Sequence, residues 1–285
     1  MNDMCYCQYA FVRPECRVQE IGPGVDPQFN VELIREGTIA AVVSRGDLDR
    51  FDPERLQGKT AEDIQWLGKI AARHNEIICQ AASSSAVLPL RLGTVFRSRD
   101  SLLDMLVRCR ATVAKFLQRL GNQQEWGVKL YMEGKRGQSP FAANGDSPLF
   151  SPPSGEQTPS LKERRGENRA SPPSEASGTA YLTRKKADLD NRRELRASVF
   201  QTIQSVEQCL AGKAEQCCRI RNLPSDLTGH FEEMVFNAAF LLPPSARESW
   251  LETVQNVDRD VRGKGLVLEV SGPWPPYHFC PTLGS

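Results

Sequence analysis

The spacing of apolar positions predicts strands mixed with helices over the first 124 residues. Residues 6–12 and 38–44 are expected to be strands, and the unbroken apolar run 39–43 is typical of a buried strand. Thr60 and Ser98 are expected to begin two helices, because each side chain can accept a hydrogen bond from a backbone N–H of the first turn. The first helix should turn one apolar face inward: Ile64, Leu67, Ala71, His74, Ile78 and Ala81. The second should bury Leu102, Leu106, Cys109, Val113, Phe116 and Leu120 before Gly121 ends it.

Two features of the first 124 residues need an interpretation. His74 lies on the apolar face of its helix, so we expect a hydrogen-bonded core histidine rather than a catalytic base. Residues 87–92 form a short apolar run that Pro89 interrupts. Since proline cannot donate a ladder hydrogen bond, this run is expected at a sheet edge or a bulge.

From Trp126 onward the pattern predicts the element order β-α-β-β-α-β. The expected strands are 126–132, 215–221, 233–242 and 266–270, and the expected helices are 185–211 and one begun by a capping box of Ser245 and Glu248. This is the order of a ferredoxin-like fold, which places both helices on one face of a four-stranded antiparallel sheet. Residues 233–242 are apolar on both faces, which predicts a central strand and a second sheet face that is covered rather than solvated.

The two patterns predict an α+β protein of two domains, 1–124 and 125–285, the second a modified ferredoxin-like βαββαβ domain with a long disordered insertion. The insertion is residues 133–178, of which nearly half are Gly, Pro or Ser. Such a segment cannot bury enough apolar surface to offset its ordering entropy. The chain ends in a segment rich in proline and aromatic residues, 271–285, called the tail below.

Composition narrows the function classes. The net charge of +1 gives no overall attraction to nucleic acid or to an anionic membrane, and no apolar run approaches the ~20 residues that span a bilayer. The first twelve residues lack a basic segment and make a poor signal peptide.

Nine scattered cysteines without a C-x-x-C pair predict reduced thiols in the cytosol, and the spacing of Cys5 and Cys7 does not favour zinc. Phosphate-loop motifs are missing, so no nucleotide is expected. With only three histidines and no nucleophile-elbow or protease signature, we expect no cofactor, metal or catalytic residue.

Two segments are candidate sites for an interdomain contact or a partner. In the first, Arg91 follows Pro89 within an apolar run and is expected in an ion pair or in a partner contact, while Gly93 and Thr94 should form a turn with unusual backbone angles. The second is the tail, whose prolines limit the entropy lost on docking and whose rings bring apolar area. Its candidate residues are Gly272, Pro273, Trp274, Pro275, Pro276, Tyr277 and Phe279. They could dock on the first domain and join the two domains, or on a partner.

These same segments carry a resemblance to a known family. Residues 87–96, VLPLRLGTVF, and residues 272–279, GPWPPYHF, resemble two motifs of the gas vesicle synthesis proteins of the GvpL/GvpF family. Shorter matches at 125–129, 178–182 and 236–241 follow in the same order, so the resemblance spans nearly the whole chain. It implies a two-domain, non-enzymatic accessory protein of gas vesicle formation, found at the gas vesicle in the cytoplasm. The implied partners are the major shell protein, whose aggregation it prevents and whose nucleation it assists, and other gas vesicle accessory proteins.

The main alternative is a ferredoxin-like module that binds RNA or a small molecule. The basic residues of 184–196 alternate with acidic ones, as on a solvated helix face, and the strand 215–221 carries no aromatic residue for stacking on bases. We therefore expect no nucleic acid and no membrane among the partners.

Overall fold

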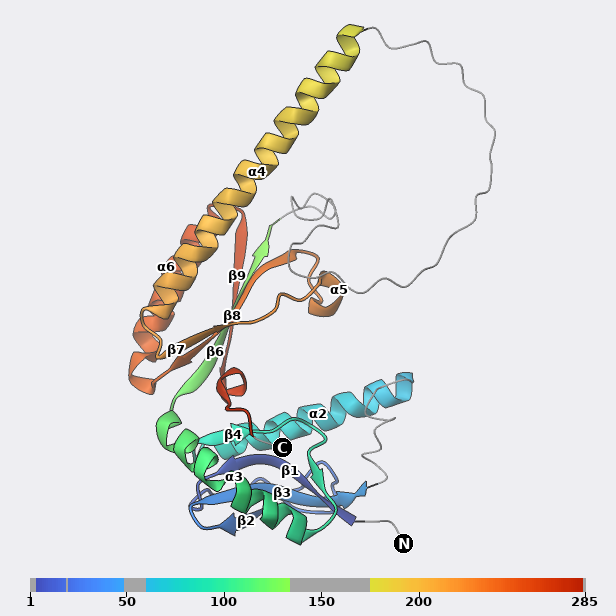
Figure 1. Cartoon of the computed structure of the whole chain (residues 1–285), viewed down its shortest axis with the longest axis vertical. Coiled ribbons are helices and arrows are strands. Elements are labelled where there is room, and N and C mark those ends of the chain that lie inside the picture. The colour runs from blue at the N-terminus through green and yellow to red at the C-terminus, as the bar shows by residue number, and fades with distance from the viewer. Residues whose placement is uncertain (1–3, 19, 49–59, 134–174, 284–285) are drawn as a thin grey trace, which may run out of the picture.

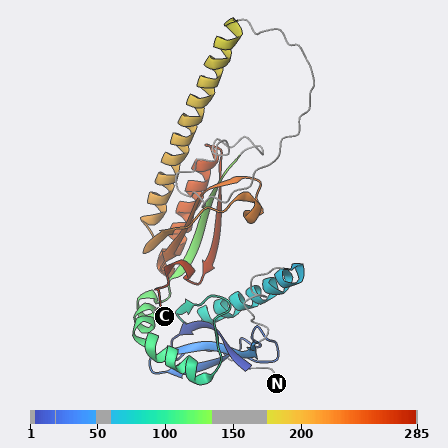
Figure 2. The ribbon, with the colours of Figure 1, turned by 45° about the vertical axis from the view of Figure 1, so that its right-hand side comes forward.

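The computed structural model describes residues 4–18, 20–48, 60–133 and 175–283. Two β-sheets lie one beyond the other along the long axis, and helix α3 leads from the first sheet into strand β6 of the second (Figure 1). The long helix α4 projects beyond the second sheet at the end far from the first (Figure 2). The molecule is therefore a mixed α/β protein with two antiparallel sheets, as the sequence predicts.

The first sheet has the order β2-β3-β1-β4, and β5 also pairs with β1. Its strands are β1 (Met4–Val12), β2 (Glu32–Glu36), β3 (Ile39–Asp47), β4 (Val87–Pro89) and β5 (Val95–Phe96). Helix α2 (Ala61–Ala82) packs on one face, and α3 (Arg99–Leu120) packs on the other. Successive residues of β3 consequently enter different clusters, with Ala40 and Val42 beneath α2 and Ala41 and Val43 beneath α3. Burial on both faces explains the unbroken apolar run of this strand.

Local signals place the helix starts correctly. The side-chain oxygens of Thr60 and Ser98 accept hydrogen bonds from the backbone N–H groups of Asp63 and Ser101. The predictions that Ile64 and Ala71 are buried are wrong, because Ile64 is 61% exposed and Ala71 is exposed as well. The first turns of α2 extend past the sheet, and burial begins only at Ile70 (Figure 1).

The second sheet is antiparallel, with the order β7-β8-β6-β9. Its strands are β6 (Gln124–Met132), β7 (Gln216–Arg219), β8 (Glu233–Leu242) and β9 (Leu266–Trp274). Helices α4 (Glu175–Ala211) and α6 (Arg247–Arg262) cover one face, where Trp250 lies fully buried between Trp126 and Phe240. The short helices α5 (Ser225–Thr228) and η2 (Pro244–Ala246) lie on either side of β8 in the chain. The expected central position of residues 233–242 is confirmed, since β8 pairs with both β6 and β7.

The opposite face of this sheet is covered in part. The His230 ring stacks on Tyr131 at a centroid distance of 4.3 Å, and the side-chain amide of Asn237 donates to the Arg221 carbonyl oxygen. At the other end of β8, Leu241 belongs to the apolar cluster beneath α3. The chain's own 220–230 segment and its first half thus provide the cover that the apolar pattern predicts.

Two boundary predictions for the second half are wrong. Helix α4 begins at Glu175, so residues 175–178 of the predicted insertion are helical, while residues 134–174 lie outside the described residues. The capping box of Ser245 and Glu248 does not form: Ser245 lies in the 3-10 helix η2, and α6 begins after it without a side-chain cap. The two prolines that end β8 direct the chain into this tighter turn first.

Truncating Trp250 tests the core of the second sheet. Its ring is fully buried, and its indole N–H donates to the Leu210 carbonyl oxygen at 3.2 Å. We expect Trp250→Ala to lower the free energy of unfolding by ~3–5 kcal/mol, because the cavity adds to the lost burial. Urea denaturation measures this loss. Val107→Ala, on the exposed surface of α3, is the control and should change the free energy of unfolding by less than about 0.5 kcal/mol. Equal effects of the two substitutions would refute the place of Trp250 in this core.

Candidate functional site

The tail starts inside the second sheet rather than after it. Strand β9 runs through Pro273 and Trp274, Pro275 and Pro276 are buried, and residues Tyr277–Phe279 form one turn of 3-10 helix, η3. Proline is compatible with this strand because β9 is at the end of the sheet order, where its outer side needs no ladder donor.

Gly272 brings the tail close to strand β6. Its φ is +134°, and a Cβ atom there would lie 2.9 Å from the Glu125 carbonyl oxygen and 3.1 Å from the Trp126 ring. A side chain would therefore meet backbone that cannot move without disturbing the sheet. Only glycine fits both the backbone angle and the space.

The carboxylate of Glu125 holds the tail from the second sheet. Glu125 is 3% exposed, and its two oxygens accept hydrogen bonds from the His278 backbone N–H at 2.9 Å and from His278 Nδ1 at 2.6 Å. The hydrogen bond to this carboxylate raises the pKa of His278 against the opposing effect of burial. When the imidazole is protonated, it forms an ion pair with the carboxylate, and the two hydrogen bonds fix the path of the tail.

On its other side the tail contacts the first half of the chain. The Tyr277 hydroxyl donates to Asn75 Oδ1 of α2 at 2.6 Å. Phe279, Cys280 and Leu283 pack against the apolar cluster beneath α3. Burial raises the pKa of the Cys280 thiol to about 12 and also raises that of the Tyr277 hydroxyl, so both groups are neutral near pH 7. The tail thus touches both halves of the molecule.

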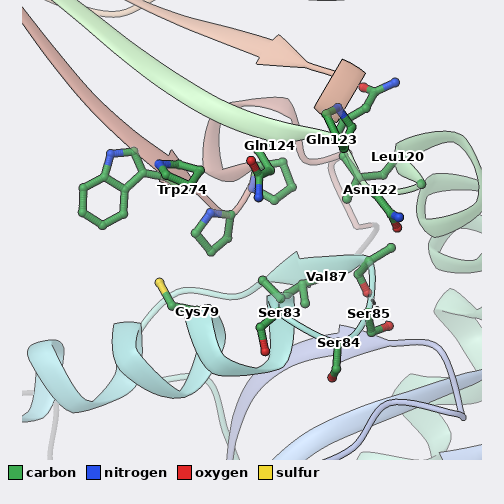
Figure 3. Close-up of a pocket in the computed structure, with 17 residues that line it drawn as sticks. Cys79, Ser83, Ser84, Ser85, Val87, Leu120, Asn122, Gln123, Gln124 and Trp274 are labelled. Atoms are coloured by element: carbon green, nitrogen blue, oxygen red, sulfur yellow. Dashed lines mark hydrogen bonds between the residues drawn. The ribbon is translucent and has the colours of Figure 1, made fainter. Parts of the chain in front are cut away.

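A groove of about 460 Å³ lies between the tail and the first half (Figure 3). The end of α2 and the loop that follows it, Cys79 to Val87, form one wall, and the linker Leu120–Gln124 and the tail prolines form the other. Trp274 lines it as well and is 40% exposed. The polar lining consists of hydroxyl and amide groups, with no Asp, Glu, Lys, Arg or His among the described residues that line it.

The segment around Arg91 lies elsewhere and has structural contacts. Pro89 is buried at the end of β4, and Gly93 has a φ of +86°, as expected for an unusual turn. The hydroxyl of Thr94 donates to the Arg91 carbonyl oxygen at 2.8 Å, and the Thr94 carbonyl accepts from the Gln8 N–H. Arg91 itself is exposed in the turn, so the premise of a charge within a strand is wrong, and no ion pair with a described carboxylate forms.

The groups that could do chemistry are dispersed or buried. His74 hydrogen-bonds the Leu90 carbonyl oxygen at 3.0 Å and is buried, which lowers its pKa and agrees with the predicted core histidine. Burial raises the pKa of the Cys79 thiol, the one ionisable side chain among the described residues of the groove. In the described part of the chain, no cluster of His, Cys, Asp or Glu is arranged to hold a metal ion. The groove is suited to neutral polar and apolar contacts rather than to proton transfer.

Sequence reasoning found the tail but missed the groups that receive it. The sequence does contain a signal for Glu125. This residue directly precedes a strand of alternating apolar residues, and a carboxylate buried there needs a partner. No sequence signal distinguishes Asn75, because it is one polar residue among many on α2.

The helices in the described part of the chain include no candidate for a membrane span.

Substituting Gly272 by alanine should destabilise the second sheet. The strained φ and the contact of Cβ with the Glu125 carbonyl predict a loss of ~1–3 kcal/mol in the free energy of unfolding. Chemical denaturation of the full chain measures it. Gly263→Ala is the control, because Gly263 has an ordinary helical φ and nothing closer than 3.6 Å to a new Cβ. A loss no greater than the control's would contradict this close approach.

The pair of His278 and Glu125 should make stability depend on pH. The raised pKa of His278 means that its contribution is complete below pH 6.5, the ordinary histidine value, and is lost as the pH rises through the pKa of the folded protein. We expect at most about 1 kcal/mol, since the histidine side chain is 42% exposed and solvent screens the pair.

The measurement is the free energy of unfolding at pH 5.5 and at pH 8.5 for the native chain and for His278→Gln. The native chain should lose more stability than the variant as the pH rises. Val107→Ala, on the exposed surface of α3, serves as control and should keep the pH dependence of the native chain. An unchanged pH dependence in His278→Gln would disprove the pairing.

Comparison with known proteins places the chain in a family. Residues 5–281 match the family model described as gas vesicle synthesis protein GvpL/GvpF. Gas vesicle protein L of Streptomyces sp. (strain CB03234) is 27% identical over 87% of this chain and 82% of its own length, and gas vesicle protein F of the same strain is 24% identical over 92% of each. The crystal structure of the gas vesicle protein GvpF from Anabaena sp. PCC7120 has the same fold, with a TM-score of 0.62, 16% identity, and coverage of 98% of this chain and 97% of that one. The chain therefore belongs to the GvpL/GvpF family of gas vesicle synthesis proteins and has a role in gas vesicle formation.

Proposed function

We propose that this protein is a non-enzymatic accessory protein that binds the major gas vesicle shell protein, limits its aggregation and assists nucleation of the wall. The family match over residues 5–281 is the observation that carries the proposal. A wall that excludes water from a gas-filled space requires a subunit with a strongly apolar face and strand edges that can pair. Before assembly such a subunit is prone to aggregate, so a protein that covers it meets a physical need.

We also propose that the chain is divided into domains 1–124 and 125–285, the second of ferredoxin-like topology. The strand order β7-β8-β6-β9, with α4 and α6 on one face, supports this assignment. The core beneath α4 and α6 consists only of residues from 126 onward, whereas the core beneath α2 ends at Val95. The cluster beneath α3, which also contains Leu241 and the tail, joins the two domains.

The groove beside Trp274 is the surface that we assign to the shell protein. Trp274 ends the edge strand β9, whose outer side pairs with no other described strand. An extended apolar segment could add to this edge by main-chain hydrogen bonds and continue across the tryptophan ring into the neutral groove. Pro273, Pro275 and Pro276 would shape the contact, while Tyr277 and Phe279 join the domains.

The Arg91 turn is a second place for a contact, with other gas vesicle accessory proteins. Its guanidinium is exposed, whereas Pro89, Gly93 and Thr94 only shape the turn. We place the protein at the gas vesicle in the cytoplasm, with no nucleic acid or membrane among its partners.

Binding to the purified major shell protein tests the proposal. The native chain should retain it in a pull-down and reduce its light scattering on dilution from denaturant. Trp274→Ala should weaken binding by ~10-fold or more, as for a central aromatic contact. Phe231→Ala, another exposed ring, is the matched control and should bind like the native chain. Absence of binding and of any effect on scattering by the native chain would refute the function; equal binding by Trp274→Ala would refute the surface alone.

A further inference from the structure

Helix α4 consists of a packed half and a projecting half. Val199 is the first residue of the helix whose described side chain is buried, and Ile203, Val206 and Leu210 continue this packing to its end. Every residue of 180–198, called the arm below, is exposed. Figures 1 and 2 show the arm extending past the ends of β6 and β9 and past α6.

One seven-residue repeat continues through both halves. Two sets of positions form this repeat. Members of one set are seven residues apart, and the two sets are offset by three or four residues, which is the spacing along the line of contact, or seam, of a coiled coil. The first set is Leu182, Leu189, Arg196, Ile203 and Leu210, and the second is Lys185, Arg192, Val199 and Val206. In the packed half every seam position is apolar and faces the sheet or α6. The arm continues the same seam outward without a described partner for its apolar side chains.

The arm's seam combines apolar and basic residues. Leu182 and Leu189 are 64% and 50% exposed, and they lie one heptad apart on the same line of the helix. Lys185 and Arg192 occupy the alternating seam positions, and the acidic residues Asp190 and Glu194 fall on the opposite side of the helix. The arm carries six basic and three acidic residues between 180 and 198. Its seam is therefore both apolar and positively charged.

This composition argues against three other occupants. A parallel second copy of the arm would place Lys185 and Arg192 opposite other cations, and an antiparallel copy would place them opposite Leu182, Leu189 or Arg196 with no carboxylate, so both pairings are unfavourable. An RNA strand would gain nothing from the exposed leucines, and the seam of the arm offers no aromatic ring on which a base could stack. A membrane-bound helix keeps its cations off the apolar face, whereas here they alternate with the leucines along one line.

We propose that the arm is a docking site for an acidic amphipathic helix of another protein. Leucine or isoleucine of that helix would pack on Leu182 and Leu189, and its glutamates would pair with Lys185 and Arg192. Docking would add tertiary contacts to a helical segment that has few of its own, and isolated helices of this length are marginal in water. The site is remote from the groove, and it does not depend on binding of the shell protein there.

A synthetic acidic helix is the probe for this site. It is a peptide of about four heptads with leucine at one seam position, to meet Leu182 and Leu189, and glutamate at the other, to meet Lys185 and Arg192. Fluorescence anisotropy with the full chain gives the dissociation constant. We expect saturable binding that a peptide of the same composition, with the seam glutamates moved to its outer face, does not reproduce.

Paired variants separate the seam from general charge. Arg192→Glu and Leu189→Gln should each weaken binding by ~10-fold or more, equivalent to about 1.4 kcal/mol. Arg184→Glu makes the same charge change off the seam, and Ala187→Gln places the same amide on the opposite side; each should weaken it by less than about twofold. All four positions are exposed, so circular dichroism should show unchanged helix content.

Several results would overturn the proposal. These are no saturable binding of the acidic peptide, equal losses for Arg192→Glu and Arg184→Glu, or tighter binding of an RNA oligonucleotide or of anionic vesicles than of the peptide. Self-association of the native chain that Leu189→Gln abolishes would assign the arm to a second copy instead. Failure to bind the shell protein would leave each of these results unchanged, so the two proposals are tested separately.

Discussion

The buried carboxylate of Glu125 is the constraint on which the arrangement of the two sheets depends. A carboxylate removed from water must be paired and hydrogen-bonded, and here the backbone and ring of His278 supply both requirements. Glu125 lies at the start of the second sheet, directly after the linker from α3, and His278 lies just beyond its last strand. The pair of Glu125 and His278 therefore joins the start of the second sheet's first strand to the segment after its last strand, next to the end of the first half.

The groove and the exposed Trp274 follow from this junction. Tyr277 and Phe279 lie on either side of His278, and they contact α2 and the cluster beneath α3. With both rings held, the tail prolines form a wall that faces the end of α2. The surface that we assign to a partner is consequently built from segments of both halves, and its shape depends on how they are joined.

Features determined by neighbours in sequence could be predicted, whereas those determined by distant contacts could not. The caps at Thr60 and Ser98, the doubly buried strand β3 and the β-α-β-β-α-β order all follow from side-chain chemistry within one element. The exposure of Ile64 depends on where the first sheet ends. The tail was identified as a docking segment from its prolines and rings, but its acceptors Asn75 and Glu125 are 202 and 153 residues away from their partners. Periodicity contains no information about such pairs.

The order of strands in the second sheet also has a consequence during synthesis on the ribosome. Among the described strands, β6 pairs with β8 and β9 alone, and both follow it by more than a hundred residues. At a translation rate of about 5–20 residues per second, β6 waits on the order of 5 to 20 seconds for its first neighbour. The first sheet has all its strands by Phe96 and can fold in that interval. Every nascent chain of this protein therefore passes through a stage in which the apolar strand β6 has been made and its neighbours β8 and β9 have not.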